Sequence, residues 1–381
     1  MNFDLTEDQK MIRDTARDFA NREVEPKAAA LDKAGRWPAE LVKQMGELGF
    51  MGMTIPPEYG GSGLDAVSYV LAMEEISRAC ASTGVIMSVN NSLYCDPVYK
   101  WGTEEQKREF LVPCASGEKL GCFALTEPMS GSDAQTMVTG VEAVGDDLIL
   151  NGSKNFITCG PHAHYAIVFA VSHRDGTRLK HDALIFPTDL PGVTKAPHDE
   201  KLGIHAAHSC TLYFDNVKLN RKQHLLGPEH QGFKVAMVTL DGGRIGIASQ
   251  ALGIARAALE KAIAYAKERQ AFGGPIANLQ AIQFMIADMA TELDAARLLT
   301  LRAAYLKDKK ARHSTESAMA KLFASEAATR IAHKAIQIHG GYGYTVEYGV
   351  ERHYRDARIT EIYEGTSEIQ RLVIAAGMLK D

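Results

Sequence analysis

The stretch Leu-Ile-Leu-Asn-Gly-Ser-Lys-Asn-Phe-Ile-Thr at residues 148–158 stands between two long helical blocks. Its Asn151-Gly152 pair tolerates the positive φ angles of a type I′ turn, so the stretch predicts a β-hairpin. Further short apolar runs follow at residues 165–171, 183–186 and 211–214, with Gly, Pro and Asp between them. Short strands at this spacing predict a small β-barrel or β-sandwich in the middle of the chain.

Helical patterns occupy the chain on both sides of this β region. Thr6 and Gln9 form a capping-box pattern, in which a hydroxyl and an amide satisfy two free backbone donors at a helix start. Further helices are expected at residues 38–48, 66–81, 103–111, 237–263, 279–305, 314–340 and 368–379. Four long C-terminal helices with short connections predict an antiparallel bundle. We therefore expect an α+β chain with an N-terminal helical domain (residues 1–120), a middle β domain (121–230) and a C-terminal helical bundle (231–381).

The composition excludes several functional classes. The 381 residues are 46% hydrophobic and 23% charged, and the net charge of −5 gives no overall basic field that would favour nucleic acid. The six cysteines form no C-x-x-C pair, which argues against a disulfide framework and a zinc site. The acidic start lacks the features of a signal or transit peptide, and every apolar run is too short to cross a bilayer. We expect a cytoplasmic protein, or a mitochondrial-matrix protein if a presequence has been removed.

The usual signatures of nucleotide binding and hydrolysis are missing from the sequence. It has no Gly-x-Gly-x-x-Gly turn after a strand, no phosphate-binding Gly-x-x-x-x-Gly-Lys-Ser/Thr loop, no His-Glu-x-x-His pair and no Gly-x-Ser-x-Gly elbow. Any nucleotide cofactor must therefore be held by something other than a Rossmann turn, and no metal is expected.

Two stretches carry polar residues in unusual settings. Residues 123–133, where the first helical block meets the β block, combine hydroxyls with turns and a glycine, which suits phosphate or heterocycle binding but also an ordinary domain linker.

Asp241 and Arg244 share one face of the first bundle helix. The two glycines between them cost roughly 1 kcal/mol each relative to alanine, which indicates a close approach to the helix backbone. A surface ion pair in a poor helix is the alternative.

A third stretch, residues 358–370, places Glu364 in a predicted loop. Ser367 and Gln370 form a capping-box pattern, so a helix is expected to begin near residue 367. Glu364 lies just before it, beside the permissive Gly365, where a carboxylate can reach into a cleft and the positive end of the helix favours its ionised form. A solvent-exposed loop acid fits the same pattern. Spacing alone indicates a three-part cleft and identifies no reaction.

Taken together, these stretches resemble the acyl-CoA dehydrogenase family over essentially the whole chain. The order of a helical block, a β block and a four-helix block is that family's fold. The shared motifs are Pro-Glu-Tyr-Gly-Gly (57–61), Leu-Thr-Glu-Pro (125–128), Gly-Ser-Asp (131–133), Asn-Gly-Ser-Lys (151–154), Arg-Gln-Ala-Phe-Gly (269–273), Gly-Gly-Tyr-Gly (340–343) and Tyr-Glu-Gly-Thr-Ser-Glu (363–368). Residues 240–252 and 351–372 are similar in nearly every position to the short-chain (butyryl-CoA) branch.

The resemblance implies that Glu364 is the catalytic base and FAD the cofactor. Isovaleryl-type and some long-chain members place their base at the position of Gly243, which cannot act as one. Positions that match contacts to the flavin or its pyrophosphate are Phe123, Thr126, Ser132, Phe156 and Thr158. Positions that match residues holding FAD, several from a neighbouring subunit, are Arg269, Phe272, Gln280, Gln337, Gly340 and Gly341. Thr366 and Glu368 match further FAD contacts, and Ser132, Asp241, Arg244 and Gly365 match acyl-CoA contacts.

Phe156 is the one departure from the family pattern that bears on the flavin. The family commonly has Trp at this position, where it covers one flavin face. Phe still supplies an aromatic wall, but it has no indole donor and less area. The resemblance therefore leaves the flavin's exposure and potential open.

The resemblance also implies a mechanism and partners. Glu364 removes the α-proton while the β-hydride passes to flavin N5, which yields a trans-2-enoyl-CoA of the kind formed in fatty-acid β-oxidation. The Glu364 N–H and a flavin ribityl hydroxyl stabilise charge on the thioester oxygen, and an apolar acyl chain raises the pKa of Glu364 by dehydrating it. Electron-transfer flavoprotein is the implied electron acceptor, and a homotetramer built as a dimer of dimers is the implied assembly.

Three alternatives stay open at this stage. The same chemistry on a branched acyl-CoA, such as isobutyryl- or 2-methylbutyryl-CoA, is the nearest. An oxidase, in which oxygen reoxidises the flavin, is the second. A non-catalytic flavoprotein or helical interaction protein on the same fold is the third, and the net charge of −5 and the intact residues 363–365 argue against it.

Overall fold

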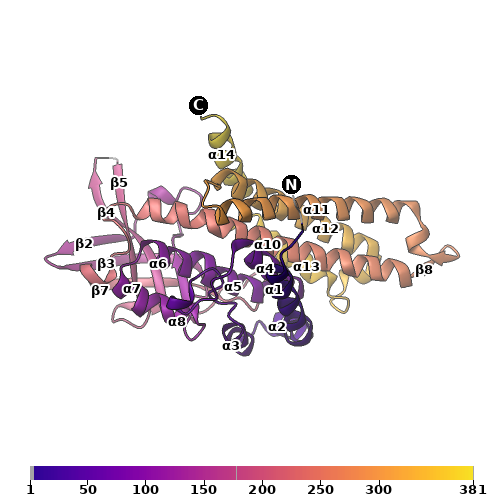
Figure 1. The fold of residues 1–381 in the computed structure, drawn as a ribbon, viewed down its shortest axis with the longest axis horizontal. Helices are drawn as coiled ribbons and strands as arrows, with labels where there is room; N and C mark the ends of the chain where they lie inside the picture. The colour runs from indigo at the N-terminus through magenta and orange to yellow at the C-terminus, as the bar shows by residue number, and fades with distance from the viewer. Residues whose placement is uncertain (1–3, 177, 381) are drawn as a thin grey trace.

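A curled β-sheet lies at one end of the molecule, and a bundle of long helices extends away from it (Figure 1). The computed structural model describes residues 4–176 and 178–380. The N-terminal helices pack along the sheet and the near half of the bundle. They are α1 (Glu7–Phe19), α2 (Glu25–Ala34), α3 (Ala39–Glu47), α4 (Ala66–Ala79), α5 (Ala81–Ser88), α6 (Asp96–Trp101), α7 (Glu104–Gln106) and α8 (Val112–Ala115). The α+β fold expected from the sequence is confirmed.

The expected N-terminal helices begin where their capping residues predict. The Thr6 side chain accepts the Gln9 N–H at 3.2 Å, and the Gln9 side chain accepts the Thr6 N–H at 3.1 Å. Thr103 and Gln106 form a second capping box at the start of α7, which continues as a π-helical turn to Leu111. The predicted helix at residues 66–81 ends at Ala79 because Cys80 is extended, and α5 follows.

The middle region is one seven-stranded sheet, with strands in the order β1-β4-β2-β3-β7-β6 and β5 paired to β4. Its strands are β1 (Gly121–Ala124), β2 (Gly140–Val144), β3 (Asp147–Thr158), β4 (Tyr165–Asp175), β5 (Arg178–Pro187), β6 (Val193–Lys195) and β7 (Ser209–Asn220). Alternate residues of β4 enter two apolar clusters, because successive side chains point to opposite faces. Ile167 and Phe169 pack toward the helices, whereas Ala166 and Val168 pack within the curl of the sheet.

The predicted hairpin at residues 148–158 is wrong. These residues form the single strand β3, and the turn to its neighbour β2 lies earlier, at Gly145, which has a φ of 63°. Asn151 and Gly152 form a bulge against β7 instead. Asn151 Oδ1 accepts the Asn216 N–H at 2.8 Å, and Gly152 has a φ of 137°. A bulge and a hairpin turn need the same permissive backbone, so the dipeptide alone does not distinguish them.

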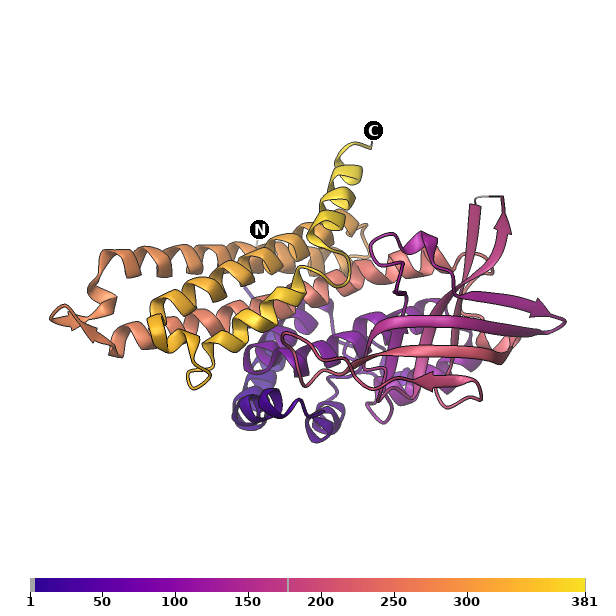
Figure 2. The same cartoon turned by 180° about the vertical axis from the view of Figure 1, so that it is seen from behind.

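The C-terminal block contains three long helices and two short ones. They are α10 (Gly232–Glu268), α11 (Gln280–Asp308), α12 (Ser314–His339), α13 (Val350–Thr360) and α14 (Ser367–Met378). A small hairpin, β8 (Gln270–Ala271) and β9 (Gly274–Pro275), joins α10 to α11 at the end farthest from the sheet (Figure 1). The view from behind shows the yellow segment with α13 and α14 reaching back to where the bundle meets the sheet (Figure 2).

Helix α14 begins at Ser367, as predicted, but its capping differs from the prediction. The N-cap is Thr366, whose hydroxyl accepts the Ile369 N–H at 3.4 Å, and Ser367 is the first helical residue. The Gln370 amide donates to Glu364 O at 3.2 Å and to Gly365 O at 2.8 Å. The expected Ser367–Gln370 capping box is therefore wrong, because the Gln370 side chain turns toward the preceding loop.

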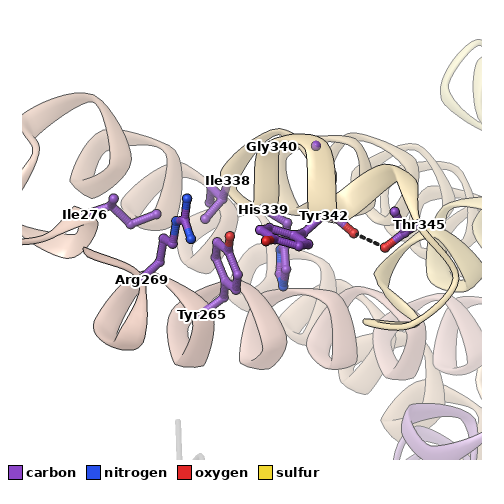
Figure 3. A pocket seen from close by; sticks show the side chains of 9 residues that line it. Tyr265, Arg269, Ile276, Ile338, His339, Gly340, Tyr342 and Thr345 are labelled. Carbon is purple, nitrogen blue, oxygen red and sulfur yellow. Dashed lines mark hydrogen bonds between the residues drawn. The ribbon is translucent and has the colours of Figure 1, made fainter. Parts of the chain in front are cut away.

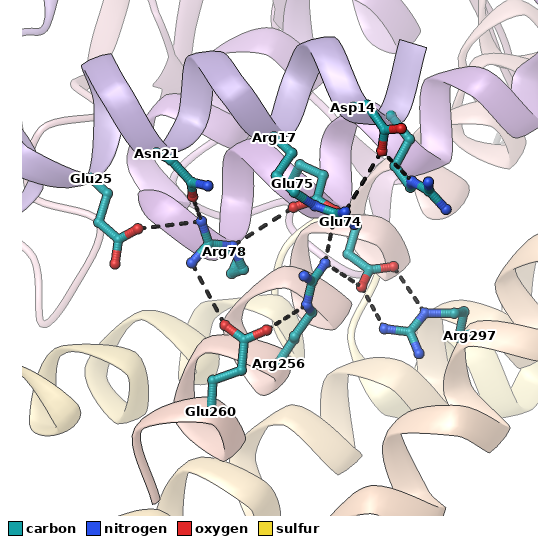
Figure 4. Close-up of polar contacts among 11 residues, drawn as sticks. Asp14, Arg17, Asn21, Glu25, Glu74, Glu75, Arg78, Arg256, Glu260 and Arg297 are labelled. Carbon is teal, nitrogen blue, oxygen red and sulfur yellow. Dashed lines mark hydrogen bonds and ion pairs between the residues drawn. The ribbon is translucent and has the colours of Figure 1, made fainter. Parts of the chain in front are cut away.

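An ionic cluster fixes α4 against the bundle (Figure 4). Glu75 is buried on α4 and accepts from Arg17 on α1 at 2.7 Å and from Arg256 on α10 at 2.9 Å. Glu74 beside it accepts from Arg297 on α11 at 3.0 Å. Buried carboxylates need such partners because an unpaired buried charge is costly. The cluster therefore ties α4 to α1, α10 and α11, and α10 forms one wall of the candidate active site.

None of the described helices has both the length and the apolar composition that are required to span a bilayer.

Candidate active site

A cavity of about 800 Å³ lies where the sheet, α10 and the loop between α13 and α14 meet. All three blocks of the chain contribute to its walls. Nine of the residues singled out in the sequence line it: Phe123, Thr126, Ser132, Phe156, Thr158, Arg244, Glu364, Gly365 and Thr366. The remaining walls are mostly apolar, with Leu93, Phe233, Met237, Leu240 and Ile369 among them. Sequence analysis did not single out Leu93, Phe233, Leu240 or Ile369 as cavity residues, because helical spacing does not distinguish a cavity wall from a core face.

Glu364 reaches from its loop to the backbone of α10. It has a φ of 54°, a left-handed conformation that is uncommon for a residue with a side chain. A Cβ built on Gly243 would lie 2.1 Å from Glu364 Oε2 and 2.7 Å from Leu93 Cδ2. The Glu364 carboxylate therefore lies against Gly243, which explains the glycine at this position of the helix. The two positions at which the resemblance places a base converge on the same space.

Glu364 Oε2 is buried and has no hydrogen-bond partner among the described residues. Burial raises the pKa of Glu364 to about 7, and the positive charges of Lys321 and Arg244 oppose that rise. The effect of burial on the pKa is therefore larger than that of the groups that favour the ionised form. A carboxylate with this pKa accepts a proton well at neutral pH.

Arg244 and Asp241 form a mostly buried pair on α10. Arg244 Nη1 lies 2.6 Å from Asp241 Oδ1, and only 4% of the Arg244 surface is exposed. The Arg244 Nε–H has no partner among the described residues, and burial lowers the pKa of this guanidinium. The surface-pair alternative is therefore wrong. A positive group of this kind at the cavity wall can bind a polar or anionic part of a ligand.

The loop that carries Thr126 and Ser132 is tied to β3 by a buried ion pair. Lys154 Nζ lies 2.8 Å from Glu127 Oε1 and donates to Leu125 O at 2.9 Å. Glu127 also accepts the N–H groups of Val138 at 2.6 Å and Thr139 at 2.9 Å. Burial lowers the pKa of Lys154 to about 8, and Glu127 opposes that shift. These contacts fix the segment that carries Thr126 and Ser132 as part of the site, so it is not a passive linker. The motifs at 125–128 and 151–154 contain both partners of this pair.

Phe156 stands on the cavity wall at an irregular point of β3. Its φ is 57° and 65% of its surface is exposed, whereas its neighbour Ile157 is buried. The register of β3 against β7 shifts between Lys154 and Ile157. This bulge re-aims the aromatic ring, which is a common use of bulges beside binding sites.

A second group of predicted cofactor residues lies away from this cavity. Arg269, Gly340 and Gly341 line a separate hollow of about 490 Å³ near the far end of α10, where the Arg269 guanidinium lies 5.6 Å from the centre of the Tyr342 ring (Figure 3). Phe272 is 93% exposed at the tip of the β8–β9 hairpin. Gln280 and Gln337 are exposed and do not line the Glu364 cavity, whereas Glu368 is exposed on the first turn of α14, close to the Glu364 loop. Within one chain, the structure does not bring this group to Glu364.

Comparison with known proteins identifies the family. Residues 6–118, 122–217 and 230–379 match the N-terminal, middle and C-terminal domains of acyl-CoA dehydrogenases. The chain belongs to the acyl-CoA dehydrogenase family. The mitochondrial short-chain specific acyl-CoA dehydrogenase of Bos taurus is 56% identical over 377 residues, which are 99% of this chain and 91% of the bovine protein. The predicted family, enzyme class and similarity to the short-chain branch are confirmed.

Solved structures of this dehydrogenase family superpose on the whole molecule. Butyryl-CoA dehydrogenase from Megasphaera elsdenii is 42% identical with a TM-score of 0.97, and the match covers 100% of both chains. A glutaryl-CoA dehydrogenase from Mycobacterium smegmatis, solved in complex with FADH2, is 35% identical with a TM-score of 0.93, covering 98% of this chain and 95% of the other. Members of this dehydrogenase family bind FAD, so the predicted cofactor is confirmed.

The residues around the Glu364 cavity fit a flavin. The exposed ring of Phe156 offers an aromatic surface for a planar heterocycle, and the hydroxyls of Thr126, Ser132 and Thr158 offer hydrogen bonds beside it. Glu364, whose Oε2 has no hydrogen-bond partner among the described residues, lines the same cavity.

Proposed function

We propose that this protein dehydrogenates short-chain acyl-CoA thioesters between Cα and Cβ to give trans-2-enoyl-CoA, with Glu364 as the base. The observation that carries the proposal is the buried, unpartnered Oε2 of Glu364 inside a largely apolar cavity. A structural carboxylate at this depth would have at least one oxygen paired, as Glu75 and Glu127 do through Oε1. A carboxylate kept without a partner is suited to take a proton from a ligand.

The proton step follows from the surroundings of Glu364. Because its pKa is raised to about 7, a large fraction of the group is ionised at neutral pH and still basic enough to remove a weakly acidic α-proton. The cavity excludes water from Oε2, which keeps the carboxylate reactive. Bound FAD supplies the acceptor for the hydride that leaves Cβ.

The backbone of Glu364 is suited to a second role. Among the described residues, its N–H donates to no other group. We propose that it donates to the thioester oxygen, where negative charge grows as the α-proton leaves. One preorganised donor of this kind is typically worth about 3–4 kcal/mol in the transition state.

We propose that two chains share each cofactor site. Phe123, Thr126, Ser132, Phe156, Thr158 and Thr366 would hold FAD from the chain that carries Glu364. Arg269, Phe272, Gln280, Gln337, Gly340 and Gly341 would contribute from a neighbouring subunit, which accords with their place away from Glu364. The homotetramer built as a dimer of dimers is part of this proposal. The roles of Glu368 in FAD binding, and of Ser132, Asp241, Arg244 and Gly365 in binding acyl-CoA, stay proposals as well.

The acyl chain is proposed to be short and unbranched. Its α-carbon must reach Glu364, which lies against α10 with Leu93 directly beside Gly243. The similarity to short-chain specific relatives supports this length. Electron-transfer flavoprotein is the proposed acceptor of the electrons.

An anaerobic substrate panel tests the proposed function. The purified yellow protein is mixed with straight and branched acyl-CoAs of about four to eight acyl carbons, and loss of the visible flavin band is followed. Butyryl-CoA is expected to bleach the flavin fastest. Faster reaction of octanoyl-CoA or a branched acyl-CoA would overturn the short-chain assignment, and no bleaching by any thioester would overturn the function. Oxygen consumption without another acceptor would identify an oxidase.

A further inference from the structure

A buried lysine lies next to the Glu364 loop, and the mechanism above does not use it. Lys321 is on α12, its side chain has no exposed surface, and Nζ donates to Gly365 O at 2.7 Å. Burial lowers the pKa of Lys321 to about 8, while the charge of Glu364 opposes that shift. A fully buried lysine is rare unless it has a specific partner. Here the hydrogen-bond partner is a carbonyl of the residue that follows the base.

Two side chains hold the backbone of this loop. Gln370 on α14 donates to Gly365 O at 2.8 Å and to Glu364 O at 3.2 Å, so Gly365 O accepts from both Gln370 and Lys321. Glu364 and Gly365 have φ angles of 54° and 95°. A non-glycine residue keeps such a conformation only when its surroundings fix it. Lys321 and Gln370 supply that restraint from two different helices.

The two donors differ in charge, and this difference matters for Glu364. Lys321 and Arg244 are the two cations that lower the pKa of Glu364 against the effect of burial. Arg244 is already paired with Asp241, whereas Lys321 has no carboxylate within ion-pair distance among the described residues. The other titratable groups facing Glu364 are the phenols of Tyr69 and Tyr363, whose pKa values burial raises, so both are neutral.

We propose that Lys321 is a positioning residue: it fixes the Gly365 carbonyl and supplies a buried positive charge that favours the ionised form of the Glu364 carboxylate. This inference rests on the proposed function of Glu364. Lys321 and Gln370 differ in what they add: both restrain the Gly365 carbonyl, but Gln370 is neutral and only Lys321 carries a charge. Groups facing Lys321 itself are Glu364, Arg244, Glu361 and Glu368.

Substitutions that change charge and hydrogen bonding separately test the proposal. Lys321→Gln keeps a donor and removes the charge, Lys321→Met removes both, and Lys321→Arg keeps the charge. Gln370→Leu is the matched control because it removes a neutral donor to the same carbonyl. The measurements are the pH profile of flavin bleaching by butyryl-CoA under anaerobic conditions and an infrared titration of the carboxyl band that Glu364→Gln abolishes.

In Lys321→Gln and Lys321→Met, the acid limb of the rate profile and the infrared titration should both move to higher pH, by roughly one pH unit. Lys321→Arg should restore the original limb. Gln370→Leu should slow bleaching without moving the limb. If Lys321→Met does not fold, Lys321→Gln still decides the result. An unchanged limb and titration in Lys321→Gln would overturn the proposal while leaving Glu364 as the base. Absence of bleaching in the wild type would overturn the proposed function, and the infrared titration would still test Lys321.

Discussion

The side chain of Glu364 depends on one glycine. Its Oε2 lies where any side chain on Gly243 would begin, and its own backbone adopts a left-handed conformation. The sequence predicted a carboxylate on a loop beside a glycine, but the burial of that carboxylate follows from α10, α12 and α14 closing around it. Burial of this kind is a tertiary property, so spacing along the chain could not show it or predict its effect on the pKa.

Gly243→Ala should displace the catalytic carboxylate. The added Cβ would lie 2.1 Å from Glu364 Oε2, so the side chain must move. We expect the rate of flavin reduction to fall roughly 100-fold, as for a small misplacement of a reacting group. Gly242→Ala is the control, because its Cβ meets only the flexible end of Lys307, at 3.2 Å. Equal rates in the two variants would contradict this placement of Glu364.

The pH dependence of the reaction should report the raised pKa of Glu364. The base acts in its ionised form, and its pKa in the folded protein is about 7, above the ordinary value for glutamate. The rate of flavin bleaching should therefore be low below this pH and rise to a plateau above it. Stopped-flow measurements between about pH 6 and pH 8 would show the rise. A rate that is already flat across this range would show that Glu364 is ionised throughout.

At the scale of single elements, the sequence predicted helices well where caps and apolar periodicity agree. The start of α1 and the long helices of the bundle are examples. Helix α13 was missed because the polar residues His353, Asp356 and Thr360 share its buried face with Val350 and Ala357. The course of β3 was misassigned because Asn151-Gly152 serves as a bulge. Pairing with β7 decides that outcome, and pairing partners are distant in sequence.

The Lys154–Glu127 pair should stabilise the strand that carries Phe156. Lys154→Met leaves Glu127 buried without its cation, and we expect the free energy of unfolding to fall by about 3–5 kcal/mol. The matched control is Lys218→Met, which breaks the exposed Lys218–Asp147 pair between β7 and β3 and should cost far less, because solvent screens an exposed pair. Denaturant titration of both holoproteins measures the difference. Similar losses would show that the buried pair has no special role.

At the scale of the whole molecule, the order of helical, β and helical blocks was predicted correctly, and the β block proved to be one curled sheet. The site was harder to predict because its walls come from all three blocks. The sequence could not show that Arg269 and Phe272 lie at the opposite end of α10 from the Glu364 cavity. That placement is what makes a shared site between chains a specific, testable proposal.

Complementation between chains tests the shared site. Arg269→Ala alone should lose FAD, measured as the ratio of flavin to protein absorbance, although Glu364 is intact. Co-expression of Arg269→Ala with Glu364→Gln should restore activity, because in a mixed pair one site combines an intact Glu364 with an intact partner Arg269. Full FAD content in purified Arg269→Ala, or no restored activity in mixed assemblies that are shown to form, would contradict the proposal.

The catalytic role of Glu364 is tested most directly by the Glu364→Gln variant under anaerobic conditions. The amide keeps the size of the side chain but cannot accept the α-proton. We expect FAD to remain bound and the rate of flavin bleaching by butyryl-CoA to fall about 1,000-fold relative to wild type. Bleaching at the wild-type rate by the yellow Glu364→Gln protein would contradict the assignment of Glu364 as the base.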